Sequence, residues 1–304
     1  MLAMTGRVTM LGIARWAGNG GSYRTVQRFF YTVIPWPVFL WVFFRQHVLD
    51  PTDTYLLAGD ACVVTKAGKK TYGLDRFFSS LYGKAVPGLS FFALSLMSLN
   101  ARRSSPIQVE HMRRTEAEKA ATETRAHKRI AQPKHPAKQG KAGRPRGSKN
   151  REKTHVVLSP ELQRIHTMMQ QQLAVINGVI PLCQMVLDGH FGNNPALHMV
   201  RSVGFHLISK LRHDAARYFP YDGPYAGRGP HRKYGSKLDY AHIPVKYLKR
   251  TTVEDHIHTN IYQAQMWHKE FASSLNVVIM VKINLKTQAR AHVVLFSSDR
   301  ELKR

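Results

Sequence analysis

The strongest constraint on the fold of this chain is a pair of aspartates placed in its most strand-like apolar runs. Asp60 lies inside the run YLLAGDACVVTK, and Asp188 ends the run VIPLCQMVLD. Burying an unpaired carboxylate costs several kcal/mol, so each aspartate needs either a cationic partner or a bound metal ion. Gly59, which precedes Asp60, would let another group approach the backbone closely.

Two explanations account for these aspartates. The first is a divalent-cation site, because carboxylate oxygens are the ligands that Mg²⁺ prefers. Two such ions can activate a water or a DNA 3′-hydroxyl and stabilise the leaving oxygen in phosphoryl transfer. The second is structural: Asp60 pairs with Lys66 or Arg76, and Asp188 caps the helix that follows it. The two residues by themselves leave both explanations open.

Strand-like and helix-like segments alternate along the chain, which predicts an α/β fold. The runs TYLLAGDACVVTK and SFFALSLMSL predict strands within residues 51–100. The segment SPELQRIHTMMQQQLAVING predicts a helix with a serine N-cap and an Asn-Gly stop. NPALHMVRSVG predicts a shorter helix, and FHLISKLRHDA, NVVIMVKIN and AHVVLFSSD predict later strands.

Composition divides the chain further. Residues 1–50, with arginines among aromatics, predict a helical, DNA-binding-like region. Residues 101–155 are rich in Lys and Arg and poor in aromatics, so we expect a flexible basic linker there. The apolar stretch 29–44 is short for a membrane span and contains Pro35 and Pro37, so we expect a buried helical hairpin or a packed corner.

The charge balance indicates the partner. The chain has 45 Lys and Arg residues against 19 Asp and Glu, a net charge of +26, which favours nucleic acid because each neutralised phosphate releases counterions. A membrane surface or another anionic partner is the alternative. Its two cysteines, Cys62 and Cys183, lie in apolar runs without zinc-type spacing, so we expect buried free thiols and a reducing cytoplasm.

Six blocks of the sequence, in this order, resemble transposases of bacterial insertion sequences with an Asp-Asp-Glu active site. They are RWAGNGGSYRTVQRFF, AGDACVVTKAGKKTYGLDRFFSSLYGKAVPGLSFFALSL, DGHFGN, LISKLRHDA, RKYGSKLDY and VVLFSSD. The first two blocks are long enough to be specific, and the resemblance runs through nearly the whole chain.

The resemblance implies a ribonuclease-H-like core, a mixed sheet with flanking helices, formed by residues 51–100 and 156–215. It implies a β-rich insertion over residues 216–290 and a last core strand within 291–304. Asp60 and Asp188 would be the catalytic, metal-binding aspartates, holding two Mg²⁺ ions, with Mn²⁺ as an alternative. The reaction would be DNA cleavage at transposon ends followed by strand transfer.

The resemblance also implies partners and a location. The substrate would be double-stranded DNA, namely transposon inverted repeats and a target. A homodimer would act on the two ends together, and a bacterial cytoplasmic, nucleoid-associated protein with no membrane attachment is expected.

The third carboxylate of the family stands on a helix after the last strand, within a Tyr, Arg, Glu and Lys pattern. Tyr247, Arg250 and Glu254 match the first three positions, but Ile261 occupies the fourth and the match precedes the last strand. Glu301 follows that strand directly. We therefore expect the third carboxylate to be missing, as in a truncated or split copy, the alternative being an inactive DNA-binding remnant.

Basic residues complete the expected site. The segment 143–150, GRPRGSKN, resembles an AT-hook for the A·T minor groove, although Ala142 replaces the usual preceding arginine; a solvated linker is the alternative. Further candidates are basic residues near Asp60, in a Gly-interrupted loop and on a helix. The proposed DNA contacts are Arg24, Arg28, Lys66, Lys69, Lys70, Arg76, Arg144, Arg146, Lys149, Arg232, Lys233 and Lys237.

Overall fold

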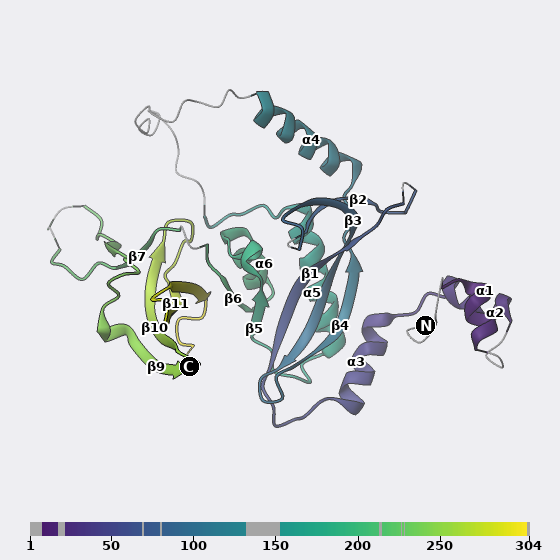
Figure 1. The fold of residues 1–304 in the computed structure, drawn as a ribbon, viewed down its shortest axis with the longest axis horizontal. Coiled ribbons are helices and arrows are strands. Elements are labelled where there is room, and N and C mark those ends of the chain that lie inside the picture. Colours follow the sequence, from purple (N-terminus) through teal and green to yellow (C-terminus); the bar gives the residue numbers. More distant parts are fainter. Residues whose placement is uncertain are drawn as a thin grey trace.

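The fold was analysed in a computed structural model, shown in Figure 1. It describes residues 8–17, 22–68, 70–79, 81–131, 153–212, 215–225, 227 and 229–302. Within these residues, helices α1 to α6 and strands β1 to β12 follow each other along the chain. None of the described helices is long and apolar enough to cross a membrane.

The N-terminal region is helical, as predicted. Helices α1 (Met10–Trp16) and α2 (Tyr23–Tyr31) pack on each other and lie apart from the sheet (Figure 1). Helix α3 (Trp36–His47) packs on the sheet through Trp41 and Phe44, whose ring meets Tyr55 edge-on. A buried helical hairpin does not form here: Pro35 separates α2 from α3, and of the alternative, a packed corner, only one side of α3 is packed on the sheet, so many aromatics of this stretch stay exposed.

The core sheet has a ribonuclease-H-like α/β arrangement. Strand β1 (Tyr55–Thr65) pairs antiparallel with β3 (Lys84–Ser98), which pairs antiparallel with β2 (Asp75–Ser79) and β4 (Arg103–His111). On its other side, β1 pairs parallel with β5 (Gln184–Leu187), and β5 pairs parallel with β6 (His206–Lys210). The predicted mixed sheet is therefore confirmed.

Helices cover one face of this sheet. The long helix α5 (Pro160–Ile176) begins at Ser159, whose hydroxyl accepts from the Leu162 amide, and ends at left-handed Asn177, as predicted. Helix α6 (Asn194–Ser202) contacts both α5 and β6. Ile165 and Met168 of α5 join Leu57 and Phe92 of the sheet in the hydrophobic core, where burial of apolar surface stabilises the packed layers.

The segment from residue 101 onward is more ordered than its composition predicts. Strand β4 replaces the first part of the expected linker, because Ile107 and Gln108 are buried against neighbouring elements. Helix α4 (Glu116–Ala131) follows and projects from the molecule (Figure 1). Thr115 and Glu118 cap its start through reciprocal backbone bonds, which satisfy amides that a helix end otherwise leaves free.

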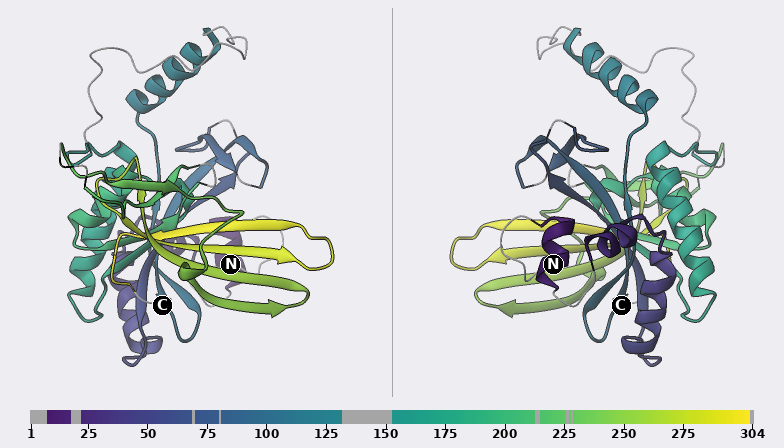
Figure 2. Two further views of the ribbon diagram at one scale, coloured as in Figure 1. Left: turned by 90° about the vertical axis from the view of Figure 1, so that its left-hand side faces the viewer. Right: turned by 90° about the vertical axis from the view of Figure 1, so that its right-hand side faces the viewer.

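The predicted β-rich insertion comprises strands β7 (Arg217–Pro220), β8 (Tyr234–Lys237), β9 (Leu248–Glu254), β10 (Ile257–His268) and β11 (Leu275–Asn284). Its strands β9, β10 and β11 extend sideways from the core together with β12 (Figure 2). Strand β12 (Arg290–Ser297) pairs antiparallel with both β11 and β6. It thereby joins insertion and core into one sheet of twelve strands.

The second face of this sheet carries no helix within the part of the chain that the structure describes. Burial alternates along β1 and β3, so Leu57 and Phe92 point into the core while their neighbours remain partly exposed. The same side includes Val109, Val293 and Leu295, which are 54, 38 and 39 % exposed. We call this side the open face. Cys62 lies on it, so the expectation of a buried thiol is wrong for Cys62 and also for the exposed Cys183.

Candidate active site

The structure places Asp60 and Asp188 side by side. Strands β1 and β5 are parallel neighbours, and their pairing aligns Ala58 with Val186 and Gly59 with Leu187. One further residue along the same register brings Asp60 opposite Asp188. Neighbouring strands lie about 4.8 Å apart, and residues in register point to the same face. Both carboxylates therefore belong to the open face.

Neither aspartate is buried, which corrects the expectation from the sequence. Both residues are exposed, although the strands that carry them are apolar. The reason is that the apolar side chains of β1 face α5, whereas Asp60 points to the opposite side. The carboxylates therefore keep their hydration, and their placement needs no compensating charge.

The structural explanations for the two aspartates are only partly met. No described Lys or Arg forms an ion pair with Asp60 or Asp188, so the pairing with Lys66 or Arg76 is absent from this part of the chain. Asp188 does cap η1 (Gly189–Phe191), since its Oδ1 accepts from the His190 amide at 3.2 Å. The Oδ1 of Asp60 accepts from the adjacent Ala61 amide at 2.8 Å.

These bonds leave one carboxylate oxygen of each aspartate without a partner among the described residues. Two unpartnered carboxylate oxygens on adjacent strands suit a hard divalent cation such as Mg²⁺, whose remaining ligands would be waters or substrate oxygens. The described residues contain no group of three or more His, Cys, Asp or Glu side chains that could hold a metal. The described residues therefore fit a divalent-cation site with two protein ligands, Asp60 and Asp188.

Close packing holds both aspartates in place. A Cβ on Gly59 would lie 2.7 Å from Phe92 Cζ and 2.9 Å from Leu187 Cδ2, so this position has no room for a side chain, as the sequence indicated. The Ser209 hydroxyl donates to the Asp188 carbonyl at 2.7 Å. At Gly192 a Cβ would collide with the carbonyl oxygen of Lys210. The η1 loop therefore rests directly on the end of β6.

Lys210 is a functional candidate that the sequence reasoning missed. It is exposed at the end of β6, and the alignment of Val186 with Ile208 puts it level with Asp188 on the open face. A lysine beside two carboxylates is suited to contact a phosphate held at a metal. Lys210 is part of the block LISKLRHDA that carries the family resemblance, but only the strand register shows that it lies level with Asp188.

A histidine adjoins the same loop. His190 Nε2 lies 3.9 Å from Glu161 Oε2 at the start of α5, an ion-pair distance rather than a hydrogen bond. The Glu161 carboxylate raises the pKa of His190, and the imidazolium in turn lowers the pKa of Glu161. The His190 ring meets Phe191 edge-on, and Phe191 meets Phe92, which ties the loop to the core.

Neither candidate for a third carboxylate joins the two aspartates. Glu254 ends β9, where it pairs with Ile257 beside the tight turn. The matching Tyr247 ends the short 3-10 helix η2 (Val245–Tyr247) and Arg250 belongs to β9, so the three residues do not share an α-helix. Glu301 lies after β12 against the insertion. The partial match to the family pattern is therefore not in the helical setting that the pattern requires.

The structure separates the basic residues predicted around Asp60 from Asp60 itself. Lys66 lies six residues after Asp60, just beyond the end of β1, which at 3.3 Å per residue is about 20 Å away. Its amide donates to the carbonyl of Pro87, which pairs with Arg76, so these two cations share the far end of β1 and β3. Lys70 is exposed in the following connection.

The other predicted DNA contacts are spread over the molecule. Arg24 and Arg28 are exposed on α2. Arg232 lies over the Tyr221 ring at 5.1 Å, Lys233 lies over the Trp267 ring at 5.6 Å, and Lys237 is exposed at the end of β8. Lys69, Arg144, Arg146 and Lys149 lie outside the described residues, and the AT-hook-like segment lies there with them.

The chain thus combines an α/β sheet of ribonuclease-H type with two aspartates that lie side by side where β1 meets β5. The family model of DDE superfamily endonucleases matches residues 1–274, and the chain belongs to that family. This confirms the resemblance to Asp-Asp-Glu transposases at the level of the family. No curated protein matches the chain significantly.

Proposed function

We propose that this chain is a DNA transposase of the insertion-sequence kind, in which Asp60 and Asp188 hold the catalytic Mg²⁺ or Mn²⁺. The observation that carries the proposal is the register of β1 and β5, which sets two carboxylates side by side on the open face. Bound metal would activate the attacking hydroxyl and stabilise the leaving oxygen. Asp60 and Asp188 would orient the scissile phosphate, and Lys210 would contact one of its oxygens.

We further propose that this chain cleaves DNA slowly. Among the described residues no third carboxylate joins Asp60 and Asp188, and two carboxylates alone bind a divalent ion loosely, because fewer charged oxygens compensate its lost hydration. We therefore propose an incomplete copy of a transposase, which binds transposon ends as a homodimer and cleaves slowly. The alternative is an inactive DNA-binding remnant in the bacterial nucleoid, which the exposed basic residues of α2 and the β7–β8 region would also support.

The test is nicking of supercoiled plasmid by the purified chain in Mg²⁺ or Mn²⁺. The variants are Asp60→Asn and Asp188→Asn, with Glu254→Ala to test the partial match and Asp222→Asn as an exposed control. We expect slow metal-dependent nicking that both aspartate variants lose and the other two retain. DNA binding, measured by fluorescence anisotropy, should survive in all four.

Each other outcome has a defined meaning. Nicking that persists in Asp60→Asn would refute the assignment of the aspartates. Rapid nicking that Glu254→Ala abolishes would show that Glu254 supplies the third carboxylate. DNA binding without any nicking or Mn²⁺ binding would establish the inactive remnant instead.

A further inference from the structure

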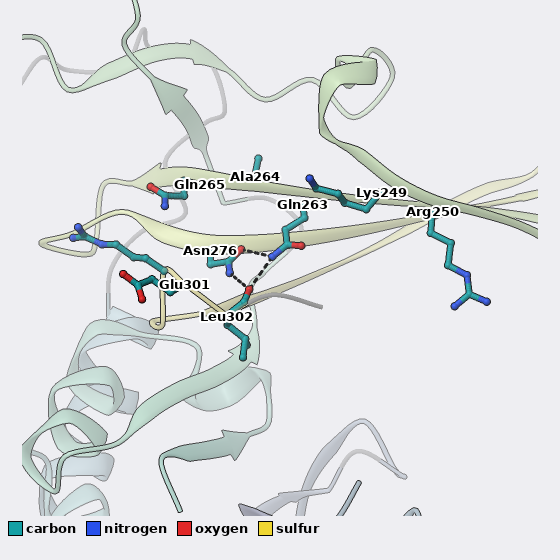
Figure 3. A pocket seen from close by; sticks show the side chains of 9 residues that line it. Lys249, Arg250, Gln263, Ala264, Gln265, Asn276, Glu301 and Leu302 are labelled. Atoms are coloured by element: carbon teal, nitrogen blue, oxygen red, sulfur yellow. Dashed lines mark hydrogen bonds between the residues drawn. The ribbon is translucent and has the colours of Figure 1, made fainter. Parts of the chain in front are cut away.

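A cavity of about 880 Å³ lies on the insertion, away from the two aspartates. Figure 3 shows it between β9, β10 and β11 on one side and the residues that follow β12 on the other. Most of the side chains that line it are cations or amides. The lining residues are Lys249, Arg250, Gln263, Ala264, Gln265, Asn276, Arg300, Glu301 and Leu302.

Positive charge in this cavity is not balanced. Three cations, Lys249, Arg250 and Arg300, and one carboxylate, Glu301, line the cavity, and none of these four takes part in an ion pair within the described chain. The charge of Arg300 also contributes to lowering the pKa of the nearby Arg201, although burial of Arg201 is the larger cause. Cations gathered without counter-charges are expected to bind an anion.

A hydrogen-bond network fixes the floor of the cavity. The side-chain nitrogen of Gln263 donates to Asn276 Oδ1 and to the carbonyl of Leu302, both at 3.0 Å, and Asn276 Nδ2 donates to the same carbonyl at 2.8 Å (Figure 3). Asn276 is buried. The segment with Arg300 and Glu301 is thereby tied across the sheet, so the cations are presented on a braced wall rather than on a free end.

The strand register places this cavity in the same row as the candidate active site. Asp188 is level with Lys210, which pairs with Leu295; Leu295 pairs with Val278, and Val278 pairs with Gln263. All these positions belong to the open face. Five strand spacings separate Asp60 on β1 from Gln263 on β10, which is about 24 Å along the sheet before its twist is considered. One bound DNA segment can span that distance.

We propose that this cavity is a second phosphate-contacting site, which binds the backbone of the DNA segment whose cleaved phosphate lies at Asp60 and Asp188. The inference rests on the proposed function and adds a residue-level contact to it. The DNA runs across the open face from β1 to β10. Arg250, Lys249 and Arg300 contact its phosphates, and the carboxylate of Glu301 weakens this contact.

The experiment measures the salt dependence of binding to a mixed-sequence DNA duplex by fluorescence anisotropy. The test variant carries Lys249→Gln, Arg250→Gln and Arg300→Gln. The matched control removes three exposed cations outside the cavity, through Arg102→Gln, Arg103→Gln and Lys286→Gln. Each lost phosphate contact lowers the slope of log K against log salt by about 0.9, so the test variant should lose about 2 to 3 from the slope and the control almost nothing.

A second variant gives a change of opposite sign. Glu301→Gln should tighten DNA binding about threefold at low salt, because it removes the one carboxylate in the cavity, and misfolding cannot produce tighter binding. Equal slopes for the test and control variants, or no tightening in Glu301→Gln, would overturn the phosphate site while leaving plasmid nicking by Asp60 and Asp188 untouched. Absence of salt-dependent DNA binding by the unaltered chain would overturn both proposals.

Discussion

At the scale of single residues, the position of Asp60 depends on the residue before it. Gly59 faces the core, where Phe92, Met185 and Leu187 all lie within 2.9 Å of the place that a Cβ would occupy. Of these two consecutive residues of β1, Gly59 is packed without free space and Asp60 is exposed to solvent. The geometry of the aspartate pair is held from the buried side of the sheet.

Gly59→Ala is accordingly expected to destabilise the fold by about 1–3 kcal/mol, since an added methyl in a filled core forces its neighbours to move. The same shift should weaken Mn²⁺ binding, because it displaces Asp60 from Asp188. Thermal unfolding and a Mn²⁺ titration measure the two effects. Ala61→Val, at an exposed position of the same strand, should change stability by less than about 0.5 kcal/mol.

Lys210→Gln should have opposite effects on metal and on DNA. Loss of a positive charge near the carboxylates should tighten Mn²⁺ binding about twofold in the absence of DNA, because like charges repel weakly even in water. The slope of DNA binding against salt should fall by about 0.9. Lys282→Gln, at the far end of β11, should leave Mn²⁺ binding unchanged; a change there would argue against a local effect of Lys210.

At the scale of elements, an ion pair attaches the start of helix α4 to the core. The guanidinium of Arg164 on α5 donates to both oxygens of Glu118, at 2.9 and 3.2 Å. This bidentate bond holds the pKa of Glu118 at about 2 instead of 4.5. Because that pKa is lowered on folding, the stabilisation is complete above pH 4.5 and is lost as the pH falls through 2.

Glu118→Gln tests this attachment, since glutamine preserves the capping bond of α4 but not the charge. At neutral pH the variant should release α4, with a loss of about 1 kcal/mol because solvent screens this ion pair, and the difference should vanish near pH 2. Hydrogen exchange of the α4 amides reports the release. Glu116→Gln breaks only the exposed pair with Lys119 and should cost less than about 0.5 kcal/mol.

At the scale of the whole molecule, twelve strands form one sheet whose two faces differ. Helices α3, α5 and α6 cover one face, and the described chain leaves the other open around Asp60 and Asp188. Strand β12 connects the core strands to the insertion strands, since its last residues, 295–297, pair with β6 and its full length pairs with β11. The strands that line the cavity and the strands that carry the two aspartates are therefore parts of one continuous sheet.

Alanine substitutions at two neighbouring residues of β12 test this difference between the two faces of the sheet. Phe296 is 1 % exposed and points into the core, so Phe296→Ala should cost about 3–5 kcal/mol. Leu295 is 39 % exposed on the open face, so Leu295→Ala should cost less than about 1.5 kcal/mol. Urea unfolding of the two variants gives the comparison. Similar losses at both positions would mean that the open face is covered in solution.

The sequence by itself determined the elements of this protein, because local patterns encode them. The cap at Ser159, the stop at Asn177 and the apolar strands around Asp60 were all readable from neighbouring residues. It also indicated the family through long matching blocks. It predicted the burial of Asp60 wrongly, since an apolar run does not reveal that only one face of its strand meets a helix.

Only the tertiary structure decided which distant residues share a surface. Strand register aligned Asp60 with Asp188 and with Lys210, separated Lys66 and Arg76 from them, and placed the partial match at Glu254 in a β-hairpin. Order in β4 and α4 likewise arose from contacts with β3 and α5 that the polar composition of this segment conceals. Pairing between strands depends on long-range packing, which no local pattern specifies.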